Sequence, residues 1–194
     1  IACQVGYTEI VTALIDANAK VNKAAGNGST PLLVACQEGH TDTVAVLLAA
    51  NATVDQADQN GETALYVACQ EGNTEIVAKL LAAKATVNKH KRNGWTPLCV
   101  ACSNGHAEVV TKLVAADANV NQTTYEGAAP MHLACQAGHD QDEHDPELVV
   151  RLTRIVATLL EAKANVDAGD DRGQTALYVA CILSRLDIVE LLLS

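Results

Sequence analysis

The chain has 194 residues, a formal net charge of −10 and a hydrophobic fraction of 49%, yet it contains no Phe. Nonspecific binding to nucleic acid needs Lys and Arg to neutralise phosphates, so this acidic balance argues against a nucleic-acid partner. No apolar run approaches the ~20 residues that a membrane span requires, which argues against membrane insertion. The length allows a substantial core. Because Phe is absent, we expect this core to consist mainly of Leu, Val and Ala.

Cysteine recurs at a fixed interval, usually within the triplet Val-Ala-Cys. Five cysteines follow one another at 33 residues and a sixth follows after 46: Cys3, Cys36, Cys69, Cys102, Cys135 and Cys181. A period in this range predicts a stack of small structural units. Alignment on the period gives six copies, of which the fifth carries a 13-residue insertion at 140–152 and the first and last are incomplete. The copies are 1–27, 28–60, 61–93, 94–126, 127–172 and 173–194.

Each copy predicts two helices followed by a polar finger. Thr30 and Thr96 are good N-caps, and Pro31 and Pro97 suit the first helical position, where no amide donor is needed. A glycine such as Gly39 should end this short first helix. The second helix shows apolar residues at i, i+3 and i+4. These residues include Val44, Leu47, Leu48; Val77, Leu80, Leu81; Val110, Leu113, Val114; and Val156, Leu159, Leu160.

The repeated motif Gly-x-Thr-Pro-Leu-x-x-Ala-x-x-x-Gly-His, with Val-Val-x-x-Leu-Leu and Ala-x-Val-Asn after it, resembles the ankyrin repeat family over the whole chain. The resemblance implies an all-α solenoid of stacked helix pairs with β-hairpin or finger loops. One helix pair cannot bury its apolar stripe alone, so neighbouring copies must complete the core. Residues 1–194 are therefore expected to form a single repeat domain.

Two positions depart from the family pattern. The His two places after Pro survives only as His132, so the polar tie that this His makes should be missing or replaced elsewhere. Its place is taken by Leu33, Tyr66, Cys99 and Tyr178. The glycine that ends the second helix is also absent, and non-glycine residues must adopt the left-handed conformation there. These residues are Asn18, Asn51, Lys84, Asp117 and Lys163.

The cysteine ladder argues against disulfides. Equivalent positions of stacked helices lie roughly 10 Å apart, beyond the ~7 Å limit on the Cα separation of a bridge. We expect buried, reduced thiols in an intracellular compartment, the cytoplasm rather than the nucleus. An alternative is a zinc site made by Cys99, Cys102, His132 and Cys135. The pair Cys99 and Cys102 and the pair His132 and Cys135 should point the same way from adjacent helices rather than toward one centre. This direction favours a packing role for these residues.

The insertion predicts a longer second helix. Asp145, Pro146 and Glu147 form a strong helix start, and an apolar stripe continues through Leu148 and Leu152. We expect two additional turns, preceded by an acidic loop. The loop residues could bind a cation but lack the spacing of a calcium loop, so a solvated loop is the favoured interpretation. They are Asp140, Asp142, Glu143, His144 and Asp145.

A partner site is predicted on the face that the finger tips and first helices form, because ankyrin-like arrays bind there. The third finger, 89–95, is a basic cluster that ends in the only Trp of the chain. Trp, Tyr and Arg are enriched at binding hot spots, so we expect this cluster to anchor a protein or peptide with acidic groups. A solvated basic loop is the alternative. The predicted partner-binding residues are Glu62, His90, Lys91, Arg92, Trp95, Asn104, Tyr125 and Gln136.

The sequence predicts a non-catalytic protein–protein interaction module or scaffold, since no catalytic motif is present and no cofactor is implied. One alternative is a metal-binding or enzymatic domain that uses the Cys/His array or the acidic insertion. Another is a structural spacer. Ile182 and Leu183 replace polar residues in the last copy, so we expect further chain or a partner to cover the C-terminal end. The chain is accordingly expected to be a fragment of a longer protein.

Overall fold

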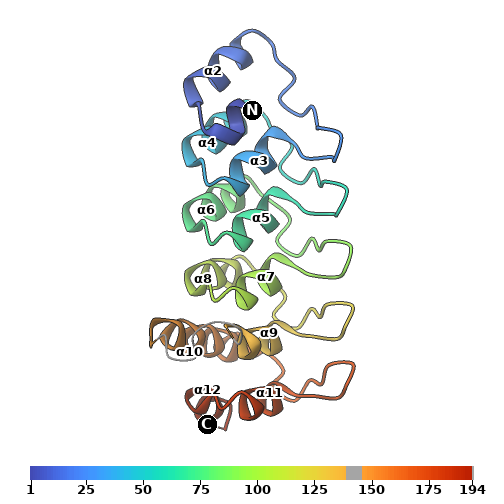
Figure 1. Ribbon diagram of the computed structural model, residues 1–194, viewed down its shortest axis with the longest axis vertical. Helices are drawn as coiled ribbons and strands as arrows, with labels where there is room; N and C mark the ends of the chain where they lie inside the picture. Colours follow the sequence, from blue (N-terminus) through green and yellow to red (C-terminus); the bar gives the residue numbers. More distant parts are fainter. Residues whose placement is uncertain (139–145, 194) are drawn as a thin grey trace. The chain divides into compact units, whose positions relative to one another are not determined.

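The computed structural model describes residues 1–138 and 146–193. These residues form pairs of helices and no strands; an isolated antiparallel bridge joins Gly169 to Thr175. The chain divides into two compact units, Ile1–Arg92 and Asn93–Ser194. Within each unit, the helix pairs lie side by side and the fingers project from one side (Figure 1). Among the described helices, none has the length and apolar character needed to cross a membrane.

The first unit contains three helix pairs. In each pair a short helix is followed by a helix that runs back beside it. The first helices contact one another in the order α1, α3, α5, and the second helices contact one another in the order α2, α4, α6. The helices are α1 Ala2–Val5, α2 Thr8–Asp16, α3 Pro31–Gln37, α4 Thr41–Ala49, α5 Ala64–Gln70 and α6 Thr74–Ala82.

The described part of the second unit repeats this arrangement. The first helices contact one another in the order α7, α9, α11, and the second helices in the order α8, α10, α12. The helices are α7 Pro97–Ser103, α8 Ala107–Ala115, α9 Pro130–Gln136, α10 Pro146–Glu161, α11 Ala176–Ile182 and α12 Leu186–Leu193. The all-α stack of paired helices that the sequence predicted is thus confirmed within each unit.

Threonine begins the first helices as the sequence predicted. The Thr30 and Thr96 hydroxyls accept hydrogen bonds from the backbone N–H groups of Leu33 and Cys99, both at 3.1 Å. Thr63 and Thr175 make the same bond. Each bond satisfies one of the N–H groups that a helix start leaves without an intrahelical partner, and so the four threonines set where α3, α5, α7 and α11 begin.

The alanine and cysteine ladder lies in the core. Ala35, Ala68, Ala101, Ala134 and Ala180 are each 0% exposed. Cys36, Cys69, Cys102 and Cys135 share this burial. Small side chains at these places let neighbouring first helices approach closely, while the leucines of the first and second helices fill the space between the two rows. The core is therefore a thin layer that continues from one helix pair to the next within a unit.

The second helices end in left-handed residues. Asn18, Asn51, Lys84, Asp117 and Lys163 have φ between 59° and 62°. The left-handed conformation, which was expected at these positions although glycine is absent, is therefore present at each of them. Ser184 likewise has φ 54° at the turn where most other copies have glycine. Each non-glycine residue here holds a conformation that costs an L-residue roughly 1–2 kcal/mol.

The fingers are tight turns rather than β-hairpins with paired strands. Single backbone hydrogen bonds join successive fingers inside each unit: Gln59 N–H to Asn27 O at 3.0 Å and Tyr125 N–H to Asn93 O at 3.1 Å. A Cβ on Gly94, whose φ is +84°, would lie 2.7 Å from the backbone nitrogen of Tyr125. Glycine therefore meets two needs at this turn, a positive φ and a close approach of the next finger.

The long second helix is confirmed. Helix α10 has 16 residues, whereas α8 has 9, a difference of about two turns. Leu148 and Leu152 are buried, and Leu148 contacts the positions of Gly138 and Gly105. The added turns thus pack over the ends of α7 and α9. The predicted acidic loop and the Asp145 cap fall at 139–145 and lie outside the described residues.

Truncation of Leu148 should destabilise the second unit. Leu148→Ala is expected to lower the free energy of unfolding by about 2–4 kcal/mol, because the apolar contacts of the added turns are lost and a cavity remains. Val150 lies on the same helix but is 66% exposed, so Val150→Ala should change the free energy of unfolding by less than about 0.5 kcal/mol. Urea unfolding followed by circular dichroism measures both. Equal effects of the two substitutions would contradict the packing of this helix.

Glycine at the end of α6 should stabilise the first unit. Lys84→Gly removes the cost of a left-handed lysine, partly offset by the greater freedom of glycine in the unfolded chain, for a net gain of about 0.5–1 kcal/mol. Asn51→Gly, at the equivalent end of α4, should give a smaller gain because Asn tolerates this conformation. Thermal unfolding compares the two variants. A loss of stability in Lys84→Gly would refute this account.

Candidate binding surface of the fingers and first helices

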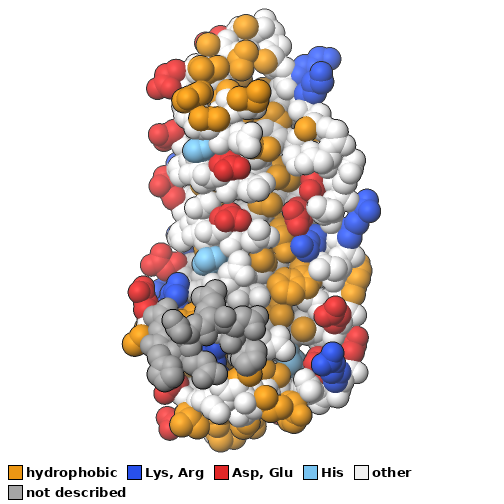
Figure 2. All heavy atoms as spheres, viewed as in Figure 1, with side chains coloured by type: hydrophobic (Ala, Val, Ile, Leu, Met, Phe, Trp, Pro, Cys, Tyr) orange, Lys and Arg blue, Asp and Glu red, His pale blue; other side chains and the backbone are white. Residues whose placement is uncertain are grey.

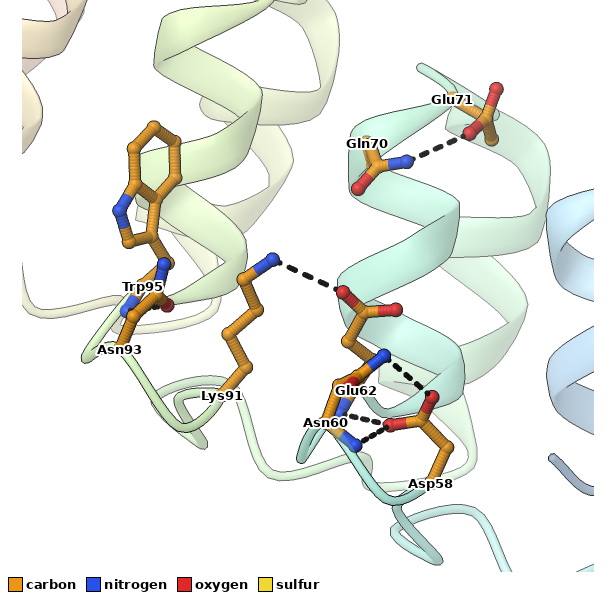
Figure 3. Close-up of polar contacts among 8 residues, drawn as sticks. All are labelled: Asp58, Asn60, Glu62, Gln70, Glu71, Lys91, Asn93 and Trp95. Atoms are coloured by element: carbon orange, nitrogen blue, oxygen red, sulfur yellow. Dashed lines mark hydrogen bonds and ion pairs between the residues drawn. The ribbon is translucent and has the colours of Figure 1, made fainter. Parts of the chain in front are cut away.

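Four of the predicted partner-binding residues lie in the first unit. Lys91 and Glu62 form an ion pair, with Lys91 Nζ 3.1 Å from Glu62 Oε1 (Figure 3). The same ammonium group lies 5.0 Å from the centre of the Tyr66 ring, within the range of a cation–π contact. His90 and Arg92 are exposed on the finger. Lys91 therefore joins its finger to the beginning of α5.

The environment of Lys91 keeps it charged. Partial burial of the ammonium acts to lower its pKa, but hydrogen bonds to Glu62 and Tyr66 outweigh this effect, and the pKa of Lys91 is raised. Lys89 is also engaged, since its Nζ donates to the backbone oxygen of Asp55 at 2.7 Å. The two lysines of the basic cluster thus hold the finger in place, and His90 and Arg92 carry its outward-facing basic groups.

The turn before α5 positions Glu62. Asp58 Oδ1 accepts hydrogen bonds from the backbone N–H groups of Asn60 at 2.8 Å and Glu62 at 2.9 Å (Figure 3). A short side chain that accepts from residues two and four places ahead closes the turn locally. The carboxylate of Asp58 thereby fixes the backbone from which Glu62 reaches Lys91.

The other four predicted residues lie in the second unit. Trp95 and Gln136 line one pocket of about 540 Å³. Tyr125, which is 67% exposed, lies on the next finger, where its ring contacts the position of Gly94. Asn104 is exposed at the end of α7, and neither it nor Tyr125 is in the lining. The structure therefore brings together two of these four residues.

The pocket is formed by both fingers and first helices. Ser103, Leu133 and Gln136 come from α7 and α9, and the other lining residues come from three fingers. The finger residues are Trp95, Thr124, Glu126, Ala128, Asp170, Asp171, Arg172 and Gln174. The predicted partner-binding residues include Trp95 and Gln136 of this lining. They do not include Thr124 or the acidic residues, because nothing in the local spacing of these residues marks a pocket.

His132 replaces the missing N-cap of α9. Ala129 stands where other copies have Thr, and its backbone N–H donates to His132 Nδ1 at 3.2 Å. Because Nδ1 accepts this bond, the proton of the neutral ring lies on Nε2, which donates to the backbone oxygen of Gln174 at 2.9 Å. His132 therefore ties α9 to the last finger, and both ring nitrogens are used.

The cysteines have different environments from one another but no metal-binding geometry. All seven are free thiols. Burial raises the pKa of Cys36 and Cys135 to about 12, and it also raises the pKa of Cys102. In the described part of the chain, no three His, Cys, Asp or Glu side chains could hold a metal ion. Both nitrogens of His132, the zinc ligand considered in the alternative, are engaged in hydrogen bonds, and the Cys/His array does not bring three donor groups together among the described residues.

Comparison with family models identifies the repeats. A model described as ankyrin repeats, in three copies, matches residues 1–90 and 78–142, and the single ankyrin repeat model matches 126–171 and 172–194. The chain belongs to the ankyrin repeat family. Members of this family are generally protein-interaction modules and are typically non-catalytic. A search of the curated proteins found no match.

Thiol labelling should separate the exposed cysteine from the ladder. Cys181 is exposed and Cys3 is partly exposed, whereas the other five are buried. A maleimide reagent should modify Cys181 rapidly and Cys3 more slowly. The buried cysteines should react least, because the reagent cannot reach them and their raised thiol pKa leaves little reactive thiolate. Mass spectrometry in native buffer and in urea measures the difference. Cys181→Ser should remove the fastest phase, and rapid labelling of Cys69 in the native state would contradict the described core.

Proposed function

We propose that this chain is a non-catalytic recognition module that binds a peptide or protein segment along its fingers and first helices. Family membership supports an interaction role in general. The observation that carries the more specific proposal is the pocket of about 540 Å³, since its walls come from both the fingers and the first helices. A recess with an aromatic wall and several polar groups is the usual form of a specific binding site.

The proposed contact residues fall into two sets. In the second unit, Trp95 and Gln136 would contact the partner inside the pocket, with Tyr125 and Asn104 beside it. In the first unit, His90 and Arg92 would contact acidic groups of the partner, while Lys91 and Glu62 hold their finger in shape. The two sets offer a partner different chemistry. Figure 2 shows acidic and basic side chains close together over the last fingers of the second unit.

The alternatives make different predictions. A structural spacer would tolerate substitution of any finger residue without change in an association. A metal-dependent function would need a donor set, and the described residues offer none. The reduced cysteine ladder supports our proposal of a reducing, intracellular compartment, the cytoplasm rather than the nucleus, because such thiols persist there.

Substitution of Trp95 should test the binding function. Peptides selected from a displayed random library against the whole chain provide a defined ligand, whose affinity is then measured by calorimetry. Trp95→Ala is expected to weaken this binding by about 2 kcal/mol or more, because an aromatic anchor in a desolvated recess dominates such interfaces. The helical circular dichroism signal should remain.

Tyr7→Ala is the matched control, since Tyr7 is an exposed aromatic residue in the turn between α1 and α2. This variant should bind the selected peptide with unchanged affinity. If Trp95→Ala leaves the affinity of every selected peptide unchanged while the control behaves as expected, the proposed binding surface is wrong.

A further inference from the structure

The pocket of the second unit carries an excess of negative charge. Its lining includes the carboxylates of Glu126, Asp170 and Asp171 against the single guanidinium of Arg172. It also includes the half-buried Trp95. We propose that this pocket binds a cationic side chain, a Lys or Arg of the partner segment. The inference rests on the proposed function and names the chemistry that its pocket selects.

The carboxylate of Asp170 is fixed in place and ionised. Its Oδ1 accepts hydrogen bonds from the backbone N–H groups of Arg172 and Gln174, both at 2.9 Å. The bond from the backbone N–H of Gln174 is the main cause of the lowered pKa of Asp170, with a smaller contribution from the backbone N–H of Arg172. The other oxygen, Oδ2, takes no part in these two bonds. Asp170 therefore presents a preorganised negative charge to the pocket.

Glycine at 127 makes room for the second carboxylate. A Cβ on Gly127 would lie 2.6 Å from Asp171 Oδ1, which real side chains do not tolerate. The backbone N–H of Asp171 donates to Glu126 O at 3.3 Å and joins the two fingers. Two carboxylates on one finger and one on its neighbour thus line the same recess, and they would attract a cation from several directions.

A buried hydroxyl in the wall lacks a partner. Thr124 is 4% exposed, and its Oγ1 has no hydrogen-bond partner among the described residues. A buried hydroxyl without a partner is destabilising, and a hydrogen-bond donor from a ligand would offset this cost. Ammonium and guanidinium groups carry several N–H donors and no acceptor. The free acceptor at Thr124 therefore points to the same class of ligand as the carboxylates.

In the first unit, the position equivalent to Thr124 holds a lysine, Lys91, whose charge is paired within the chain. Thr124 aligns with Lys91, whose ammonium lies on the Tyr66 ring and pairs with Glu62. At the same position of the next finger, Thr124 is too short to reach across to Trp95 as a lysine would. The repeat 94–126, which has Thr124 in place of this lysine, carries the pocket, an aromatic wall and an unpaired hydroxyl. A partner's Lys or Arg would supply the missing group.

A bare metal ion does not explain the same features. A divalent cation needs several oxygen ligands within about 2.6 Å of one point, and the described residues contain no such group of carboxylates. A long cationic side chain can instead bring its charge to one carboxylate while its apolar stem lies on Trp95. The recess of about 540 Å³ also leaves room for such a stem.

Small peptides test the charge preference directly. The probes are acetyl-Gly-Gly-X-Gly-Gly-amide peptides in which X is Lys, Arg, norleucine or Glu. The indole N–H of Trp95 gives a single nuclear magnetic resonance signal because the chain has one Trp. We expect saturable shifts of this signal with Lys and Arg, and none with norleucine or Glu at equal concentration. Equal binding of norleucine, binding of Glu alone, or no saturable shift with Lys and Arg overturns the inference.

Variants then assign the cation to the carboxylates. The double substitution Glu126→Gln and Asp171→Asn should weaken Lys and Arg binding about tenfold, because two of the opposing charges are removed. Asp167→Asn, an exposed acidic residue outside the lining, is the matched control and should weaken it less than twofold by lost long-range attraction. Equal effects of the two charge changes would show attraction by net charge alone and overturn the inference.

Thr124→Val separates a binding role from a structural one. Valine keeps the shape of threonine and removes the unpaired hydroxyl, so the melting temperature should stay the same or rise while Lys and Arg binding weakens. Unchanged binding overturns the part of the inference that rests on Thr124. If a selected peptide depends on Trp95 but not on Glu126 or Asp171, the proposed binding function stands and the cationic ligand is wrong.

Discussion

The structure depends on the burial of each helix pair against its neighbour. A first helix such as α5 has 7 residues and a second helix such as α6 has 9, which is too short for a helix to be stable alone in water. Their apolar faces become buried only when the next pair closes over them. The fully buried Ala68 and Cys69 show how close this approach is, because larger side chains would separate the first helices. Stability is consequently shared between neighbouring repeats within a unit.

This constraint leaves the fingers free to differ. They contribute little to the core and are joined to one another by a few hydrogen bonds, such as Gln59 N–H to Asn27 O and Lys89 Nζ to Asp55 O, so many of their side chains can change without disturbing the helices. One finger position illustrates the range. Asp58 and Asp170 accept from their own turn, Lys91 reaches an acid and an aromatic ring of its own repeat, and Thr124 leaves its hydroxyl unpaired. Variation at one place in a constant scaffold thus produces different local chemistry.

The charge of the chain is consistent with a basic partner segment. A net charge of −10 attracts cations at long range and speeds encounter, while the carboxylates of the pocket act only at contact. The exposed His90 and Arg92 add a small region of opposite sign in the first unit. A basic group of a partner would suit the pocket and an acidic group would suit that finger, so the two surfaces select opposite charges.

The fold class and the capped starts of most first helices could be predicted from the sequence, because they follow from local chemistry that recurs from copy to copy. Thr30 caps its helix, Lys84 takes the left-handed conformation, and the residues after Pro146 lengthen the helix by about two turns. The sequence also singled out Trp95 as the one Trp of the chain. The surroundings of Trp95 follow from the folded structure, since Thr124 and Asp171 come to line one pocket with it through the stacking of separate repeats. Local patterns cannot report which charges of distant fingers converge, or that Lys91 is already paired within its own unit.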